Sequence, residues 1–404
     1  MNDWIPPCAG PLAAAGLAGH DAAEALRLAA IRVDRACAEL RRGRPLALHV
    51  SKPDAAHLKG KAEAGGVPVG WLLVAAVETL DEATLHSLLQ CGSAAQLLLS
   101  AERLHALDWP DASRARALAL QHPVTLAQLQ KLAAAAPGPA ERSLLVDRHA
   151  GMVWDPALPA VLALCKRARL LPALLLLALP TDQVGALKAA EVLQVDAADL
   201  ALAAPARPGA LRRVSDAKVP LAAHEDCTLV LFRETAGDAE HLAIVVGKPP
   251  AHEPVPVRLH SSCLTGDLLG SLRCDCGPQL QRAVARLAET GGVLLYLAQE
   301  GRGTGLANKL RAYRLQDAGL DTLQADRYLG FREDERTFEA AAQILRALGH
   351  SRIKLLTNNP LKIAALSAAG INVVERLPLH APVNGHNARY IQTKEQAGHL
   401  RADD

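Results

Sequence analysis

Residues 292–318 read GVLLYLAQEGRGTGLANKLRAYRLQDA, and this stretch decides the fold class. The apolar run 292–297 predicts a buried strand, and the glycine-rich turn 300–305 opens a segment, 306–318, that we expect to be helical. Backbone N–H groups of such a turn can approach an anion, and Arg302 could hold a phosphate by a two-point contact. The same turn could equally be a tight connection in any α/β unit.

Strands and helices alternate on both sides of this stretch, which predicts an α/β (α+β mixed) fold of two domains, each a mixed β-sheet flanked by helices. The connector AAPARPGA at 203–210 places the boundary between domains 1–205 and 206–404. The last 25 or so residues are polar, and we expect them to be less ordered. Strands are expected at 45–50, 70–77, 94–100, 174–179, 227–232, 242–246, 255–259, 353–356 and 371–376. Helices are expected at 21–42, 80–91, 160–169, 278–290, 335–348 and 361–369.

The composition argues against several classes of protein. Of the 404 residues, half are hydrophobic and 21% are charged, which gives enough apolar material for a sizeable core. The formal net charge of +2, without a long basic run, indicates neither a nucleic acid nor an anionic membrane as partner. The N-terminus has no signal-peptide pattern, and the most apolar stretch, 170–180, is too short to cross a bilayer. We therefore expect a cytoplasmic protein.

Three of the eight cysteines, Cys263, Cys274 and Cys276, are bunched with the spacing C-x10-C-x-C. Eight cysteines are too dilute for a disulfide scaffold in a chain of this length. Three thiolates around Zn²⁺ would leave a fourth position for water, as a catalytic zinc requires, and zinc lowers the pKa of that water to about 7. The alternative is three idle thiols, and His260 is another candidate for the fourth ligand.

Two further segments offer polar groups suited to a phosphate. Asp334 and Arg336 in GFREDER, 330–336, lie at the expected start of a helix, where a plain N-cap with surface charges would also explain them. The segment TNNPLK, 357–362, offers a hydroxyl, amides and a lysine, and an ordinary capped turn is equally compatible. A soft-metal site, two anion-binding turns and several arginines together favour hydrolysis of a phosphorylated small molecule.

A series of motifs follows in order from about residue 211 to the C-terminus: RLHSSCLTGD, SLRCDCG, QEGRGTGL, NKLRAY, LGFREDER, LLTNNPLK and GINVVERLPL. In this order they resemble GTP cyclohydrolase II. The resemblance implies a zinc enzyme that opens riboflavin biosynthesis and converts GTP and water to formate, pyrophosphate and 2,5-diamino-6-(5-phosphoribosylamino)pyrimidin-4(3H)-one. It also implies Mg²⁺ on the triphosphate and a homodimer.

The resemblance assigns roles residue by residue. The ligands of one zinc ion per subunit, whose water opens the imidazole ring of guanine, match Cys263, Cys274 and Cys276. Arg336 matches the proposed nucleophile on the α-phosphorus, although a free guanidinium stays protonated. Asp334 matches its proton acceptor or positioning partner, and Tyr313 matches a tyrosine near the zinc. The positions that match GTP-binding residues are Arg258, Leu259, His260, Ser261, Ser262, Gln279, Glu300, Gly301, Arg302, Thr322, Thr357 and Lys362.

Two positions depart from the family pattern. Ser262 and Ala298 stand where glutamate and arginine are common, so two charges beside the ligand are absent. These departures motivate one alternative, a related hydrolase that opens the ring of a purine nucleotide but forms a different product or has a different role. A separate alternative is a non-catalytic GTP-binding regulator.

The N-terminal half resembles 3,4-dihydroxy-2-butanone 4-phosphate synthase, for example in IRVDRACAELRRGRPLAL. That family needs an acidic metal-binding loop after its first strand, where this chain reads HVSKPDAAHLKG with Asp54 as the only carboxylate. The family's Gly-His-Thr-Glu segment is also missing, because the region reads VDRHAGMVWDP. Since divalent-metal chemistry needs clustered oxygen ligands, we expect a catalytically silent domain that serves dimerisation, stability or regulation. A bifunctional enzyme is the remaining alternative.

Overall fold

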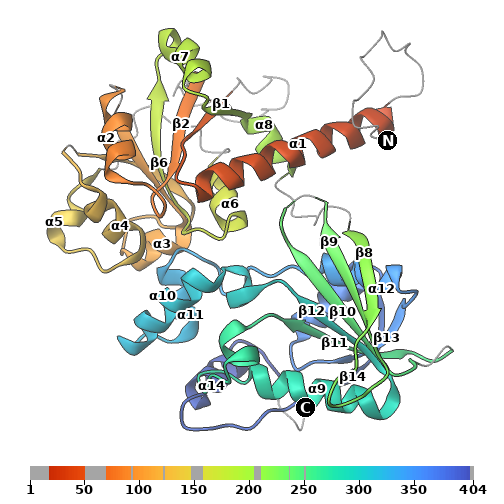
Figure 1. Ribbon diagram of the computed structural model, residues 1–404. Coiled ribbons are helices and arrows are strands. Elements are labelled where there is room, and N and C mark those ends of the chain that lie inside the picture. The colour runs from red at the N-terminus through yellow and green to blue at the C-terminus, as the bar shows by residue number, and fades with distance from the viewer. Residues whose placement is uncertain are drawn as a thin grey trace.

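Two seven-stranded β-sheets, one in each half of the chain, form the framework of the molecule (Figure 1). The computed structural model describes residues 18–50, 70–91, 94–121, 123–146, 158–203, 211–235, 237–249 and 252–400. Both sheets combine parallel and antiparallel pairs and are flanked by helices, which confirms the predicted fold class. The predicted domain boundary falls within 204–210, outside the described residues.

The N-terminal sheet has the strand order β5-β4-β3-β6-β2-β1-β7. Its central strand β6 reads ALLLLAL and is buried on both faces, which explains its unbroken apolar run. Helices α1, α6 and α8 cover one face, and α2, α3 and α4 cover the other. The strands are β1 (Leu46–Val50), β2 (Gly70–Ala76), β3 (Ala95–Leu99), β4 (Arg116–Leu120), β5 (Leu145–Val146), β6 (Ala173–Leu179) and β7 (Leu193–Asp196). The helices are α1 (Ala18–Arg41), α2 (Glu82–Gln90), α3 (Ala101–Ala106), α4 (Leu126–Ala134), α5 (Pro139–Arg142), α6 (Leu158–Arg167), α7 (Val184–Ala189) and α8 (Ala197–Ala203).

The C-terminal sheet has the order β14-β13-β11-β12-β10-β9-β8, with β14, β13, β11 and β12 parallel to one another. Helix α9 covers one face, and α12 with α13 covers the other. The strands are β8 (Leu211–Lys218), β9 (Cys227–Glu234), β10 (Glu240–Val246), β11 (Val255–Ser261), β12 (Gly292–Leu297), β13 (Arg352–Leu356) and β14 (Asn372–Leu377). The α-helices are α9 (Cys276–Thr290), α10 (Leu306–Asp317), α11 (Thr322–Tyr328), α12 (Glu339–Ala347), α13 (Pro360–Ala368) and α14 (Ala388–Gln396), and two short turns are η4 (Leu264–Leu268) and η5 (Glu300–Gly303).

Two sequence-based expectations are wrong in this half. The helix expected over 335–348 begins only at Glu339, because the Asp334 carboxylate accepts hydrogen bonds from the backbone and guanidinium of Arg336 and holds a non-helical turn there. The C-terminal segment expected to be less ordered contains α14, whose polar face packs into the molecule rather than facing water alone. The three glycines Gly301, Gly303 and Gly305 have positive φ values and form the turn that the sequence predicts before α10.

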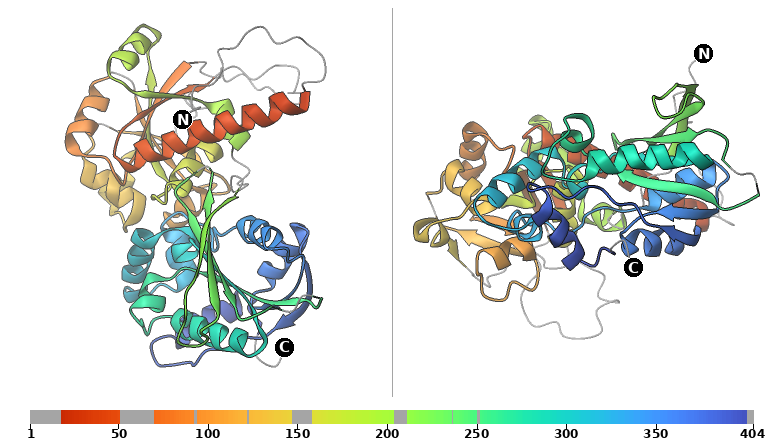
Figure 2. Two further views of the ribbon diagram at one scale, coloured as in Figure 1. Left: turned by 45° about the vertical axis from the view of Figure 1, so that its right-hand side comes forward. Right: turned by 90° about the horizontal axis from the view of Figure 1, so that it is seen from below.

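The two halves meet through α10 and α11, which lie beneath α3 and α4 (Figure 1). Ala312, Ala325, Leu329 and Phe331 of the second half are buried in the same apolar cluster as the first half's α3 and α4. Figure 2 shows a second meeting point, where the β9–β10 hairpin reaches α1 and Arg41 forms an ion pair with Asp238. Within the described ranges, no helix has the length and apolar character needed to cross a bilayer.

Candidate functional site

The main pocket opens where the parallel strands of the C-terminal sheet end. Cys263 follows β11, Glu300 follows β12 and Thr357 follows β13, so these side chains converge at one edge of the sheet. This edge is the usual ligand position in parallel α/β sheets. The pocket encloses about 1170 Å³, including solvent at its mouth, and α10, α11 and α14 complete its walls.

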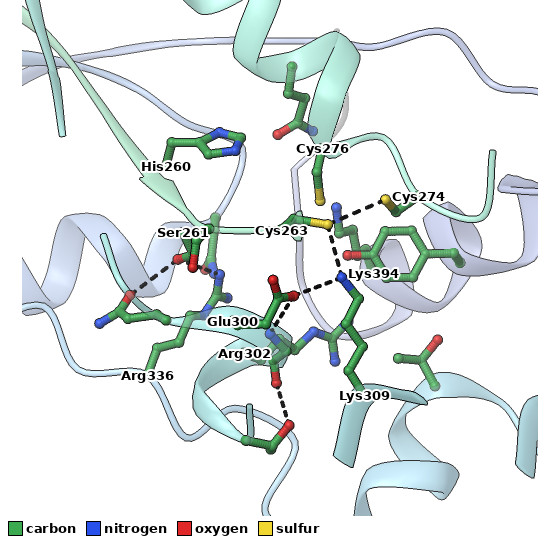
Figure 3. A pocket seen from close by; sticks show the side chains of 18 of the residues that line it. His260, Ser261, Cys263, Cys274, Cys276, Glu300, Arg302, Lys309, Arg336 and Lys394 are labelled. Atoms are coloured by element: carbon green, nitrogen blue, oxygen red, sulfur yellow. Dashed lines mark hydrogen bonds and ion pairs between the residues drawn. The ribbon is translucent and has the colours of Figure 1, made fainter. Parts of the chain in front are cut away.

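Three sulfur atoms meet at the floor of this pocket, as Figure 3 shows. The sulfurs of Cys263, Cys274 and Cys276 all lie within 4.8 Å of one another, and Cys263 Sγ is 3.8 Å from Cys274 Sγ. A tetrahedral ion with metal–sulfur bonds of about 2.3 Å holds its sulfurs about 3.8 Å apart. The predicted cluster therefore assembles closely enough to hold one metal ion, and within the described residues no further His, Cys, Asp or Glu joins it.

Two glycines allow the backbone to pass close to the sulfurs. A Cβ at Gly266 would lie 2.8 Å from Cys274 Sγ and 3.0 Å from Cys263 Sγ, and a Cβ at Gly277 would lie 2.3 Å from the Gly266 carbonyl oxygen. The Gly266 N–H instead donates to Cys263 Sγ at 3.3 Å. Such N–H donors stabilise a thiolate, so the turn is built for charged sulfur.

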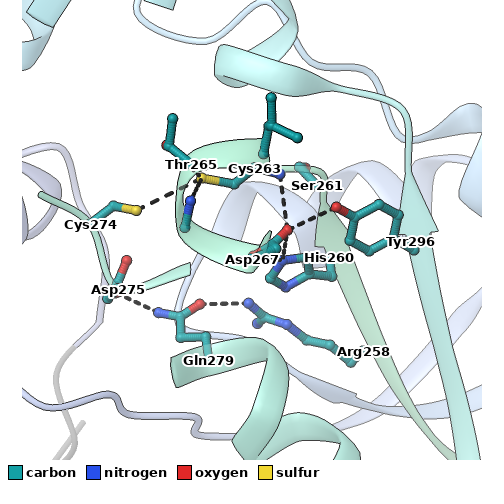
Figure 4. Close-up of polar contacts among 12 residues, drawn as sticks. Arg258, His260, Ser261, Cys263, Thr265, Asp267, Cys274, Asp275, Gln279 and Tyr296 are labelled. Carbon is teal, nitrogen blue, oxygen red and sulfur yellow. Dashed lines mark hydrogen bonds and ion pairs between the residues drawn. The ribbon is translucent and has the colours of Figure 1, made fainter. Parts of the chain in front are cut away.

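Asp267 fixes the first cysteine from below (Figure 4). Its Oδ2 accepts hydrogen bonds from the Cys263 backbone N–H at 3.0 Å and from the Tyr296 hydroxyl at 3.0 Å, and the carboxylate also faces His260 Nε2 at 3.1 Å. His260 thus turns its Nε2 toward Asp267, so the structure does not bring it into the sulfur cluster as a fourth ligand. Burial lowers the pKa of His260 despite the carboxylate.

Glu300 and Lys309 bind the same loop from the opposite side. Glu300 accepts the backbone N–H of Leu264 at 2.6 Å and forms an ion pair with Lys309 at 2.8 Å. Lys309 Nζ also lies 3.0 Å from Cys263 Sγ. Burial alone would lower the pKa of Lys309, but the hydrogen bonds to Glu300 and Cys263 raise it. A cation is therefore held beside the sulfurs, where it offsets their negative charge.

The turn η5 has an unusual backbone because Gly301, Arg302 and Gly303 have φ values of 61°, 57° and 93°. Only glycine adopts such values freely, and Arg302 does so at a cost of about 1–3 kcal/mol. The conformation directs the Arg302 side chain into the pocket, where its guanidinium lies 3.5 Å from Asp326 and over the Tyr390 ring. The glycine-rich turn is thus more than a tight connection between a strand and a helix.

Asp334 and Arg336 form a compact ion pair at the wall of the pocket. Asp334 Oδ1 accepts from Arg336 Nε at 2.9 Å, and Oδ2 accepts from a terminal guanidinium nitrogen at 2.6 Å. Burial raises the pKa of Asp334, but the hydrogen bond and charge of Arg336 outweigh it and lower the pKa. Asp334 is therefore an anion that orients Arg336 toward the pocket.

Two buried cations in the wall of the pocket have no carboxylate partner among the described residues. Lys362 is fully buried and donates to the Leu259 carbonyl at 2.7 Å, and Arg258 donates to Leu356 and Gln279. Within the described chain, neither forms an ion pair, and Arg258 Nε and His260 Nδ1 are buried with no hydrogen-bond partner. Burial, with the charges of Arg258 and Arg336, lowers the pKa of Lys362 well below its usual value. A bound anion would relieve this excess of positive charge.

The structure brings most of the sequence-predicted residues together. Leu259 is the exception: its side chain is in the core and only its carbonyl faces Lys362. Asp334 reaches the pocket through Arg336 rather than by lining it. The remaining predicted residues that line the pocket are Arg258, His260, Ser261, Ser262, Cys263, Cys274, Cys276, Gln279, Glu300, Gly301, Arg302, Tyr313, Thr322, Arg336, Thr357 and Lys362.

Other residues of the site were not predicted from the sequence. Lys309, Tyr390 and Lys394 line the pocket, and Asp275 binds Lys394 at 2.7 Å and Gln279 at 2.6 Å. Asp267 contacts the sulfur loop as described above. A signal existed for Lys309, which lies four residues before the predicted Tyr313 and so shares its helix face. Nothing in the polar C-terminal segment marks Tyr390 or Lys394.

The segments of the N-terminal half that bear on synthase chemistry lie outside the described residues. This holds for Asp54 and for most of VDRHAGMVWDP. The absence of a metal-binding loop there stays a prediction from the sequence.

Comparison with known proteins gives matches to both the whole chain and half of it. A sequence model of the family described as GTP cyclohydrolase II matches residues 212–378. A GTP cyclohydrolase-2 from Azospirillum brasilense is 43% identical over 376 residues, which cover 91% of this chain and 93% of that protein. A GTP cyclohydrolase-2 from Escherichia coli O9:H4 (strain HS) is 51% identical over 192 residues, 47% of this chain and 97% of that protein.

Among solved structures, a two-domain 3,4-dihydroxy-2-butanone 4-phosphate synthase from A. baumannii covers 87% of this chain and 100% of its own. The sequence identity is 20% and the TM-score is 0.31. A TM-score this low does not establish a shared fold.

Proposed function

The chain belongs to the GTP cyclohydrolase II family, and from this premise we propose how its residues bind GTP, hold a metal and divide the chemistry. We infer that it is a GTP cyclohydrolase II that hydrolyses GTP to formate, pyrophosphate and 2,5-diamino-6-(5-phosphoribosylamino)pyrimidin-4(3H)-one, the first step of riboflavin biosynthesis, as membership of the family implies. One observation supports our assignment of roles most: three cysteine sulfurs and several cationic side chains line the same pocket.

We assign the three cysteines to one Zn²⁺ per subunit. Soft thiolates at this spacing suit zinc, and with three protein ligands a fourth position is open. When bound, zinc acts as a Lewis acid that activates water for hydrolysis at neutral pH. Tyr313 and Lys309 extend from one face of α10 beside the sulfurs, so Tyr313 can donate a hydrogen bond to a reacting group there. Glu300, already bound to Lys309, holds the cysteine loop in place.

The cations of the pocket bind the triphosphate. Arg258, Lys362 and Arg302 supply positive charge that the protein itself leaves partly uncompensated. A helix N-terminus follows Thr357, and Asn359 caps it by accepting the Leu361 N–H, so N–H groups point to the same side. Mg²⁺ bound to the phosphates would reduce the charge of the substrate to one that these side chains match.

Arg336 is the residue we place at the α-phosphorus. As a nucleophile it would form an N–P bond while the P–O bond to pyrophosphate breaks, its proton passing to Asp334, and water would later cleave the N–P bond. The paired geometry supports a second role, in which the charged Arg336 binds the phosphate and Asp334 orients it. The two roles differ in one test, because Arg336→Lys would retain charge but lose the bidentate pair.

A product assay tests the proposal as a whole. The purified protein is incubated with GTP, Zn²⁺ and Mg²⁺, and formate, pyrophosphate and the diaminopyrimidine are quantified. We expect all three in equal amounts. Formate without pyrophosphate would instead favour a related ring-opening hydrolase, which Ser262 and Ala298 motivate. Tight GTP binding without turnover would favour a regulator.

We propose that a second copy of the chain covers the apolar surface beside the cysteine loop. Four leucines between Cys263 and Cys274 and one on α10 are exposed, with Leu268 and Leu269 more than 70% accessible. They are Leu264, Leu268, Leu269, Leu272 and Leu310. An apolar patch of this kind on a soluble protein indicates an interface. Light scattering should give a dimer mass, and Leu269→Glu should lower it to that of a monomer.

For the N-terminal half we propose a non-catalytic domain related to the dihydroxybutanone-phosphate synthases, spanning residues 1–205. If so, ribulose 5-phosphate is not consumed, whereas a bifunctional enzyme would consume it. We also propose a cytoplasmic location. The seven described cysteines form no disulfide, and a reducing compartment would keep Cys263, Cys274 and Cys276 as thiols that can bind a metal.

A further inference from the structure

The N-terminal half contacts the catalytic segment directly. Lys166 at the end of α6 reaches across the cleft between the halves and forms an ion pair with Glu335 at 2.6 Å. Glu335 is 8% exposed and stands between Asp334 and Arg336 in the sequence. Burial raises the pKa of Glu335, but Arg332 and Lys166 outweigh it and lower the pKa, so the pair is charged at neutral pH.

Glu335 links this contact to the glycine-rich turn. Its backbone N–H donates to the Arg302 carbonyl at 3.2 Å, and its side chain accepts the Arg332 N–H at 2.9 Å. A Cβ at Gly303 would lie 3.1 Å from the Glu335 carbonyl carbon, so the two segments pass in close contact. A shift of Glu335 would therefore move Asp334, Arg336 and Arg302 together.

A second contact holds the N-terminal end of the same segment. Ser100 donates to the Gly330 carbonyl at 2.8 Å, and the fully buried Arg103 donates to the Tyr328 carbonyl at 2.7 Å. Phe331 is buried in the apolar cluster of the first half. A Cβ at Gly330 would lie 2.8 Å from Pro172, so the approach requires glycine.

A third contact holds α10, the helix that carries Lys309 and Tyr313. Glu78, in the turn after β2, forms an ion pair with Arg311 at 2.9 Å, and the Arg169 carbonyl accepts from Asn308 at 3.2 Å. One face of α10 therefore contacts the sulfurs while the other is fixed by the N-terminal half.

From these three contacts we propose that the N-terminal domain is a positioning device for the cyclohydrolase site, and that Lys166 acts through Glu335 to hold Asp334 and Arg336 in their working geometry. This inference rests on the proposed roles of Asp334 and Arg336. It gives the first half of the chain a function in catalysis that requires no active site of its own. Lys166 is a positioning residue, because it touches neither the pocket nor the sulfurs.

The test uses the full-length, zinc-loaded protein with Lys166→Met, Glu335→Gln and the double variant. A misplacement of about 1 Å can cost up to about 100-fold in rate, so we expect kcat to fall about 10-fold or more while KM for GTP changes less than about twofold. The double variant should be no slower than either single one, because both remove the same contact. Lys166→Arg, which keeps the charge, should restore most of the rate.

The matched control is Arg41→Met, which breaks an ion pair between the halves, with Asp238, that does not contact the catalytic segment. It should leave kcat unchanged. Zinc content, measured by elemental analysis, should equal that of the wild type in every variant, which separates positioning from loss of metal.

Hydrogen exchange supplies a measurement that does not depend on turnover. In Lys166→Met, the backbone amides of 330–337 should exchange faster than in the wild type, and those of α9 should not. Wild-type kcat together with wild-type exchange in Lys166→Met would overturn the proposal. If instead Arg336→Ala were fully active, the assigned roles would fail, while the exchange result would still show whether the N-terminal domain holds the segment.

Discussion

The carboxylate of Asp267 lies directly beneath Cys263 and accepts its backbone N–H at 3.0 Å, while the same oxygen accepts the Tyr296 hydroxyl. A group that makes no bond to a metal thus fixes the position of a metal ligand. Groups of this kind commonly contribute 10- to 100-fold to metal affinity.

Asp267→Asn should therefore weaken zinc binding about 10-fold, because an amide offers one acceptor oxygen where the carboxylate offers two. Competition with a chromogenic chelator measures the affinity. Asp317→Asn, at an exposed ion pair with Arg273, is the matched control and should bind zinc as the wild type does. Equal affinities for the two variants would contradict the prediction.

Cys274→Ser should lose zinc and ring opening together. A serine oxygen is a poorer ligand for this ion than a thiolate, and two remaining sulfurs do not make a site. Elemental analysis and formate release are measured on the same preparation. Formate production by a metal-free variant would show that the cysteines are not the catalytic centre.

Arg336→Ala should abolish turnover while GTP still binds, since Arg258 and Lys362 remain in the pocket. Calorimetric titration with GTP gives the affinity, and product release gives the rate. Arg336→Lys separates two mechanisms. Partial activity in this variant would favour charge stabilisation, and none would be expected if the guanidinium is the nucleophile.

Lys362→Met should weaken GTP binding by at least tenfold, because it removes a buried cation that has no carboxylate partner within the described residues. The same change should stabilise the empty protein against urea, since an uncompensated buried charge is costly. Weaker GTP binding together with higher stability of the empty protein is the result expected of a site that binds an anion. A variant that is destabilised when empty would contradict this account.

Asp326 predicts a pH dependence of stability. Burial raises its pKa to about 7, so between about pH 4 and pH 7 the folded protein holds a proton that the unfolded chain has released. The contribution of this group to the free energy of unfolding falls as pH rises through that window, by about 1.4 kcal/mol per pH unit. Denaturant titrations of the wild type and Asp326→Asn at pH 5 and pH 7 should show the variant losing less stability over this range.

The sequence predicted the parts of the site that carry a local pattern. The strand 292–297 is an unbroken apolar run, and the glycines of 301–305 mark a turn that only glycine tolerates freely, so both were located correctly. The cysteine spacing indicated a metal site because three thiols so close together in the sequence can supply the soft ligands that zinc prefers. Asp334 and Arg336 were identified, but as the start of a helix, since the hydrogen bond between their side chains competes with the helix in a way that no residue spacing reveals.

The rest depended on contacts between distant segments. Lys394 and Tyr390 reach the pocket from a mostly polar C-terminal helix, whose sequence does not show which distant segment it packs against. Lys166 and Glu335 are 169 positions apart in the sequence. Lys166 lies near the end of a helix and Glu335 lies in a run of charged residues, so neither segment marks the other as its partner. Such partners are set by how the two halves pack, which a single sequence does not record.

Phe331 and Leu329, each 1% exposed, are buried by residues of the other half of the chain. Excising residues 211–400 would expose both side chains to water at a cost of about 1.5–3 kcal/mol each. An isolated second half would thus expose an apolar surface at Leu329 and Phe331 and would be prone to aggregate. A protein that consists of the second half alone has to cover the equivalent surface in another way. Cutting the connector alone is therefore not enough to separate the two halves. The apolar residues of α11 and of the loop that follows it would also have to be replaced by polar ones.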